Sequence, residues 1–129
     1  MVDTDNKNIL FLIPVSLSET DYNWYLPSNV LKTIHSIDFF IVENAKSARH
    51  FLKSIAHPLP LQQIEIFELD KHDAESQKKE LGQLLKSHGK TGLMSEAGLP
   101  CIADPGTHVV KLAHALDIRV KPLTGPSSI

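Results

Sequence analysis

Ile9-Leu10-Phe11-Leu12-Ile13 is the stretch from which the fold of this chain is predicted, because its consecutive apolar residues leave no polar face. Such a run is typical of a strand that is buried on both faces, as strands are inside a parallel sheet. Pro14 follows directly and ends the strand. Helices cover both faces of a parallel sheet, so we expect strands and helices to alternate along the chain.

The rest of the sequence follows that alternation. Ser28, Asn44 and Asp73 are placed to cap helices, and Gly89 is expected at the C-terminal end of the helix that Asp73 begins. The pattern predicts an α/β domain of three layers, with helices on both faces of a five-stranded, mainly parallel sheet and right-handed crossovers. The further strands are expected at 38–43, at 64–69 as an edge strand, at 91–95 and at 118–123.

Composition excludes several classes of protein. Hydrophobic residues make up 42% of the 129 residues and charged residues 22%, which is ordinary for a globular domain and argues against disorder. The net charge of −2 lacks the strong basic excess of a free-standing nucleic-acid module. A single cysteine rules out an intramolecular disulfide framework and agrees with a cytoplasmic location. Neither a signal peptide nor an apolar run approaching the roughly 20 residues of a membrane span is visible.

The common motifs of phosphate and metal sites are absent. There is no G-x-G-x-x-G after the first strand and no G-x-x-x-x-G-K-[ST] anywhere. The seven histidines show no metal-ligand spacing with one another or with Cys101, so we expect no metal site.

Ligands of open α/β sheets bind outside the carboxyl ends of the strands, and one segment there stands out. Residues 95–106 hold two glycines and two prolines between a buried strand and a helix, and a stiff turn of this kind can present backbone N–H groups to a ligand. A tight strand-to-helix connection without a ligand is the alternative. A second turn, 124–128, follows the last strand at the same predicted edge.

The two turns carry a resemblance to a known family. Ser-Glu-Ala-Gly-Leu-Pro-Cys-Ile-Ala-Asp-Pro-Gly at 95–106 and Thr-Gly-Pro-Ser-Ser at 124–128 resemble the tetrapyrrole methylase superfamily, most closely its ribosomal RNA small subunit methyltransferase I type. The resemblance implies methyl transfer from S-adenosylmethionine to a cytidine 2′-hydroxyl of small-subunit ribosomal RNA. It also implies a cofactor cleft between two domains, with 1–129 as the N-terminal α/β domain and a second domain beyond residue 129.

The resemblance assigns the cofactor-binding residues position by position. They are Pro14, Ser95, Glu96, Ala97, Gly98, Ile102, Ala103, Asp104, Thr124, Gly125, Pro126 and Ser127. The chain departs from the family in the loop after the first strand, where only Pro14 survives, and at 42–46, where only Glu43 survives. Glu43 is therefore the one candidate for a catalytic base; the alternative is a strand-end carboxylate beside the N-terminus of the next helix.

The acceptor and the partners are predicted more loosely. Lys46, Arg49, His50 and Lys53 fall on one helical face and suit contact with RNA phosphates, although a solvated face is the simpler alternative. A tetrapyrrole methyltransferase and a degenerate, non-catalytic ligand-binding domain are the competing functions. We also expect a homodimer.

Overall fold

Five parallel strands form one sheet in the order β3-β2-β4-β1-β5, so the sheet is wholly rather than mainly parallel. The computed structural model describes residues 8–14, 26–70, 73–95 and 105–123. The strands are β1 (Ile9–Pro14), β2 (Phe39–Val42), β3 (Glu65–Glu68), β4 (Lys90–Ser95) and β5 (Arg119–Pro122). The helices are α2 (Ser28–His35), α3 (Ala45–Ser54), α4 (Ala74–Ser87) and α5 (Pro105–Ala115), with a 3₁₀ turn at Leu61–Gln63.

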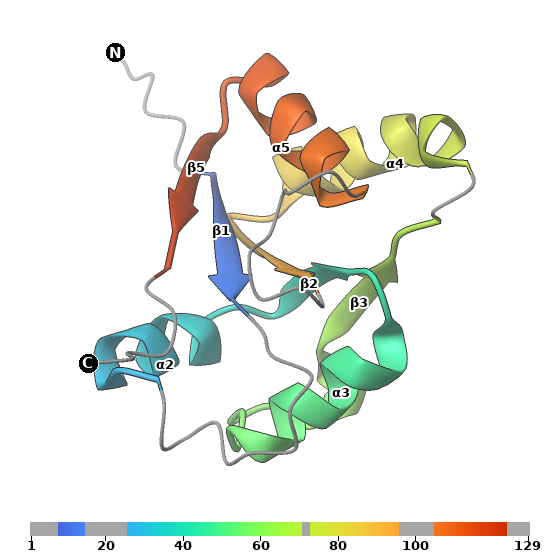
Figure 1. Ribbon diagram of the computed structural model, residues 1–129. Coiled ribbons are helices and arrows are strands. Elements are labelled where there is room, and N and C mark those ends of the chain that lie inside the picture. Colours follow the sequence, from blue (N-terminus) through green and yellow to red (C-terminus); the bar gives the residue numbers. More distant parts are fainter. Residues whose placement is uncertain (1–7, 15–25, 71–72, 96–104, 124–129) are drawn as a thin grey trace.

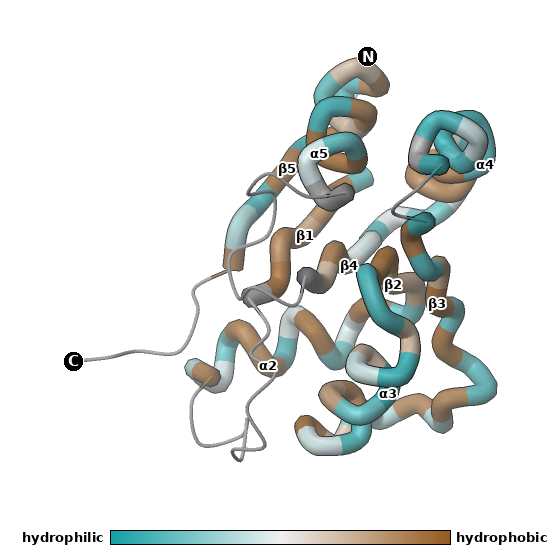
Figure 2. The backbone as a smooth tube through the Cα atoms, turned by 45° about the vertical axis from the view of Figure 1, so that its right-hand side comes forward, coloured by the Kyte–Doolittle hydropathy of each residue, from teal (hydrophilic) through white to brown (hydrophobic). Residues whose placement is uncertain are grey.

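The helices cover the sheet on both sides, which confirms the three-layer prediction. Helices α2 and α3 lie on one face and α4 and α5 on the other (Figure 1). Phe11 and Ile13 of β1 belong to the core beneath α2 and α3, whereas Leu10 belongs to the core beneath α4 and α5. The brown tube of β1 in Figure 2 runs between these two layers. A continuous apolar run is therefore required at β1, because both of its faces are buried.

Gly92 makes room for the largest side chains near the middle of the sheet. It lies opposite Phe11 of β1 and Phe40 of β2. A Cβ atom at position 92 would come within 2.7 Å of Ile13 Cδ1 and of Phe40 Cδ1. Both of these side chains are fully buried. The side chains of Ile13 and Phe40 thus occupy the space that a side chain at position 92 would need. No larger residue fits there without displacing them.

Two of the predicted helix caps are confirmed. Asn44 Oδ1 accepts a hydrogen bond from the Ser47 N–H at 2.9 Å, and Asp73 Oδ1 accepts one from the Ser76 N–H at 3.3 Å. The cap expected at Ser28 is wrong: Ser28 is the first helical residue, and Pro27 holds the N-cap position without a side-chain hydrogen bond.

The ends of α3 and α4 are stabilised in different ways. Helix α4 ends at Ser87 with an extended His88 as its C-cap, and Gly89 follows directly, as predicted. The Asn8 side chain donates to the carbonyls of Leu85 (3.0 Å) and Lys86 (2.8 Å) in the last turn of α4. Helix α3 ends where Ala56, and not a glycine, adopts a left-handed conformation, with φ of 53°. The His57 N–H there bonds back to the Leu52 carbonyl at 3.2 Å.

Two histidines connect the ends of α2 and α3 at the amino edge of the sheet. His35 Nε2 lies 2.8 Å from the Ile55 carbonyl, and His57 Nε2 lies 2.8 Å from the Ile37 carbonyl. His57 Nδ1 accepts from the Leu59 N–H at 3.1 Å, so the proton resides on Nε2 and the ring is neutral. Burial lowers the pKa of His57 below its usual 6.5, and the nearby His35 lowers it further, against the raising effect of the Ile37 hydrogen bond.

Gly92→Ala is expected to lower the free energy of unfolding by about 1–3 kcal/mol, because the added methyl group overpacks the core against Ile13 and Phe40. Gly82→Ala in α4 is the matched control. Its Cβ atom meets only Leu116 Cδ1, at an ordinary 3.7 Å, so it should raise stability by about 0.5–1 kcal/mol through helix propensity. Urea unfolding of the two variants checks the pair; equal effects would contradict the packing account of Gly92.

The free energy of unfolding is expected to fall as the pH is lowered from about 7 to about 5. The folded chain holds His57 neutral, so its contribution is complete above the unfolded pKa and is lost as the pH falls through the lower folded pKa. His57→Gln should flatten this decline, whereas His114→Gln, at an exposed position of α5, should preserve it. Urea titrations at several pH values give the measurement, and an unchanged slope in His57→Gln would refute the assignment.

Candidate functional site

Four neighbouring strands end together at the carboxyl edge of the sheet. Pro14 of β1 lies directly opposite Ser95 of β4, and Val42 of β2 lies opposite Met94. On the other side of β1, the Leu123 N–H just beyond β5 donates to the Leu12 carbonyl at 2.9 Å. The segments that begin at 14, 43, 95 and 124 therefore leave the sheet from adjacent strands, in the order β2, β4, β1 and β5.

At this part of the edge, two neighbouring strands are followed by helices on opposite faces of the sheet. The connection that leaves β1 leads to α2 on one face of the sheet, and the connection that leaves β4 leads to α5 on the opposite face (Figure 1). The neighbouring strands β1 and β4 are thus followed by helices on opposite faces of the sheet. Such a topological switch point is where open α/β sheets form their ligand crevice.

Two of the predicted cofactor residues can be placed. Pro14 and Ser95 are the paired last residues of β1 and β4, at the switch point. The others lie outside the described residues and stay predictions: Glu96, Ala97, Gly98, Ile102, Ala103, Asp104, Thr124, Gly125, Pro126 and Ser127. Their described neighbours limit their position, since Asp104 immediately precedes Pro105, the first residue of α5, and Thr124 immediately follows Leu123.

Glu43 lies at the same edge. It follows Val42, the last residue of β2, and precedes Asn44, the N-cap of α3. Its side chain is half-buried, and its Oε2 atom is buried. A carboxylate at the carboxyl edge, two strands from Pro14 and beside the strand that ends in Ser95, is compatible with the role of a base.

Glu68, which the sequence did not single out, is the carboxylate that contacts the N-terminus of α3. Its Oε2 atom accepts a hydrogen bond from the Ala45 N–H at 2.8 Å, alongside the Asn44 cap. This is the role that we considered for Glu43 as an alternative. The contact arises because β3 pairs with β2 so that Glu68 lies opposite Val42, and a residue pattern alone does not reveal that register.

The basic residues of α3 form one exposed face. Lys46, Arg49, His50 and Lys53 are all exposed, while Ala48, Phe51 and Leu52 on the other face are buried. Helix α3 begins at the carboxyl edge, directly after Asn44. At 1.5 Å per residue, the row from Lys46 to Lys53 extends roughly 10 Å away from that edge.

Two negative findings hold for the described part of the chain. No group of three or more histidine, cysteine or acidic side chains gathers there in a way that could hold a metal ion. None of the described helices is long and apolar enough to cross a bilayer.

Together, the parallel sheet and its switch point define an α/β domain whose ligand crevice lies beyond the carboxyl ends of its central strands. Comparison with known proteins gives the family. The chain is 30% identical over 98% of its length to the ribosomal RNA small subunit methyltransferase I of Vibrio cholerae. It is 32% identical over 91% of its length to the protein of that name in Buchnera aphidicola, and 27% identical over 95% to the one in Haemophilus influenzae. No family model matches the chain.

The resemblance inferred from the two turns is therefore confirmed: the chain is similar over nearly its whole length to the ribosomal RNA small subunit methyltransferase I proteins. It spans 43% of the Vibrio protein and 39% of the Buchnera protein, about two fifths of their length.

Glu68→Ala is expected to lower the free energy of unfolding by about 1 kcal/mol, because the Ala45 N–H and the positive end of α3 lose their carboxylate. Glu68→Gln keeps an acceptor oxygen and should lose roughly half as much. Glu80→Ala, at an exposed position of α4, is the control and should be close to neutral. Thermal or urea unfolding measures all three; a neutral Glu68→Ala would contradict the capping role.

Proposed function

We propose that this chain forms the cofactor-binding N-terminal domain of an S-adenosylmethionine-dependent methyltransferase that acts on a ribose 2′-hydroxyl of small-subunit ribosomal RNA in the cytoplasm. The observation that carries the proposal is the pairing of Pro14 with Ser95 and of Leu123 with Leu12, which brings together the strand ends that directly precede the predicted cofactor segments. The names of the relatives support the methyltransferase class and the ribosomal acceptor.

The chemistry of the cofactor suits the residues at 95–104. S-adenosylmethionine carries a cationic sulfonium and an ammonium group, and when bound it supplies an electrophilic methyl group. The carboxylates of Glu96 and Asp104 complement its positive charges, and Gly98 allows the backbone to approach a ligand closely. Thr124, Gly125, Pro126 and Ser127 would form the floor of the same crevice.

The acceptor hydroxyl must lose a proton when it is methylated. Glu43 is our candidate for the base, because its half-buried carboxylate lies at the edge from which the cofactor segments leave. Transfer also requires an acceptor oxygen held in line with the methyl group, so precise positioning of the RNA supplies much of the rate enhancement.

The exposed basic face of α3 favours RNA as the acceptor. Lys46, Arg49 and Lys53 lie in a row that begins beside the carboxyl edge, where they would contact phosphates on either side of the target nucleotide. A tetrapyrrole acceptor would instead need a wide apolar trough at this edge. A domain that has lost catalysis would need neither a basic face nor an apolar trough.

We further propose that residues beyond this chain supply the second wall of the cleft, because the chain spans about two fifths of its relatives. With one wall alone, the 129 residues would bind the cofactor poorly and would not methylate. Two copies would associate through the face that the second domain would otherwise cover.

The decisive experiment titrates the full-length protein with S-adenosylmethionine by calorimetry and measures methyl transfer to small ribosomal subunits. Asp104→Ala should weaken cofactor binding at least about tenfold, since a charge-assisted contact is worth roughly 1.5–3 kcal/mol. The control Glu80→Ala, on an exposed turn of α4, should bind as the unchanged protein does. Normal cofactor affinity in a folded Asp104→Ala protein would refute the assignment of the site.

The acceptor is tested in the same assay. Lys46→Glu/Lys53→Glu should reduce methyl transfer to the subunits while leaving cofactor affinity unchanged. The product should resist alkaline cleavage at one ribose, because a 2′-O-methyl group removes the attacking hydroxyl. Cofactor binding with transfer only to a porphyrin or corrin would favour the tetrapyrrole function, and no cofactor binding at all would favour the non-catalytic domain.

A further inference from the structure

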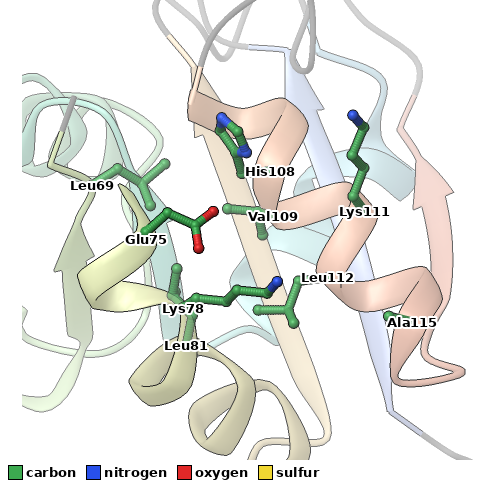
Figure 3. Close-up of a pocket in the computed structure, with 9 residues that line it drawn as sticks. All are labelled: Leu69, Glu75, Lys78, Leu81, His108, Val109, Lys111, Leu112 and Ala115. Carbon is green, nitrogen blue, oxygen red and sulfur yellow. The ribbon is translucent and has the colours of Figure 1, made fainter. Parts of the chain in front are cut away.

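A groove runs between α4 and α5, on the face of the sheet opposite to α3. One part of it is a cavity of about 260 Å³, beside the first two turns of α4 and along α5 as far as Ala115 (Figure 3). Leu69, Leu81, Val109 and Leu112 form its apolar lining. In Figure 3, Glu75 and Lys78 of α4 extend toward α5 across this lining, and His108 and Lys111 stand on the α5 side.

The groove continues along the two helices toward the amino edge of the sheet. Gly82, Gln83, Lys86 and Leu116 line this second part, and Glu75, Lys78 and Leu112 are common to both parts. The residues of α4 that line the groove run from Glu75 to Lys86, which corresponds to roughly 16 Å of helix. An open groove of that length suits a peptide segment of about three turns better than a small enclosed ligand.

The rim of the groove is cationic. Lys78, Lys79, Lys86 and Lys111 line it and are exposed, and among the described residues that line it Glu75 is the only acidic one. Within the described parts of the chain, none of the four ammonium groups forms an ion pair. The charge of the rim therefore favours an anionic occupant.

We propose that this groove binds an acidic amphipathic helix of a partner protein, with the apolar face of that helix on the half-exposed Leu112 and Leu116 and its carboxylates on the four lysines. RNA would match the lysines but gains little from a leucine floor. A second copy, docked by a two-fold axis, would bring the two cationic rims together, and like charges repel. The apolar floor and the charge of the rim together select an acidic helix.

The test uses the full-length protein and a blocked, fluorescently labelled peptide of about 15 residues, with leucines at helical spacings of three and four and glutamates elsewhere. Binding is followed by fluorescence anisotropy. We expect Lys78→Glu/Lys111→Glu to weaken binding at least about tenfold, and the matched reversal Lys46→Glu/Lys53→Glu on α3 to change it less than about twofold.

Each remaining outcome counts against the proposal. It is overturned if the peptide does not bind at about 1 mM, or if the same peptide with its leucines spread around the helix binds equally well. Equal losses in the two charge reversals would show attraction by net charge alone. Tighter binding of a single-stranded RNA that Lys78→Glu/Lys111→Glu abolishes would assign the groove to RNA, and a dimer that only this variant dissociates would assign it to a second copy.

Discussion

The structure depends on the absence of a side chain at Gly92. Its strand, β4, occupies the centre of the sheet between β2 and β1, and the space above it is filled by Phe40 from the first of these strands and by Ile13 from the second. The core beneath α2 and α3 is thus held together across three strands at one point. The same packing fixes where β1 and β4 end relative to each other, and with them the edge at which the candidate cofactor segments begin.

Sequence patterns correctly predicted the features that depend on neighbouring residues alone, namely strand burial and two helix starts. The apolar run of β1 predicted a strand buried on both faces, and Asn44 and Asp73 predicted the starts of α3 and α4, because each of these features depends on residues within one turn or one strand. Contacts between distant parts of the chain were not predicted. The last turn of α4 is bonded by Asn8, which lies 77 residues before Leu85 in the sequence, and no pattern near residue 88 signals that contact.

The candidate site also has features that the sequence predicts and features that depend on tertiary contacts. Topology alone predicted that the important segments share the carboxyl edge, because parallel strands joined by helices all end on the same side. The cap that Glu68 supplies to α3 depends on the register of β3 against β2, and the groove between α4 and α5 depends on how two helices lie across a sheet. Periodicity identifies the buried face of each helix separately, and the space between two helices is a tertiary property.

The strand order also has a consequence for how the chain acquires its structure. Strand β1 comes first among the five strands, yet its neighbours are β4 and β5, and Ile9 pairs with Lys90 and Arg119, which lie far along the chain. Strands β2 and β3, joined by α3, can pair much earlier. During synthesis, the apolar strand β1 therefore has no partner strand until β4 has been made, and such non-local pairing favours slow folding and exposes the chain to aggregation.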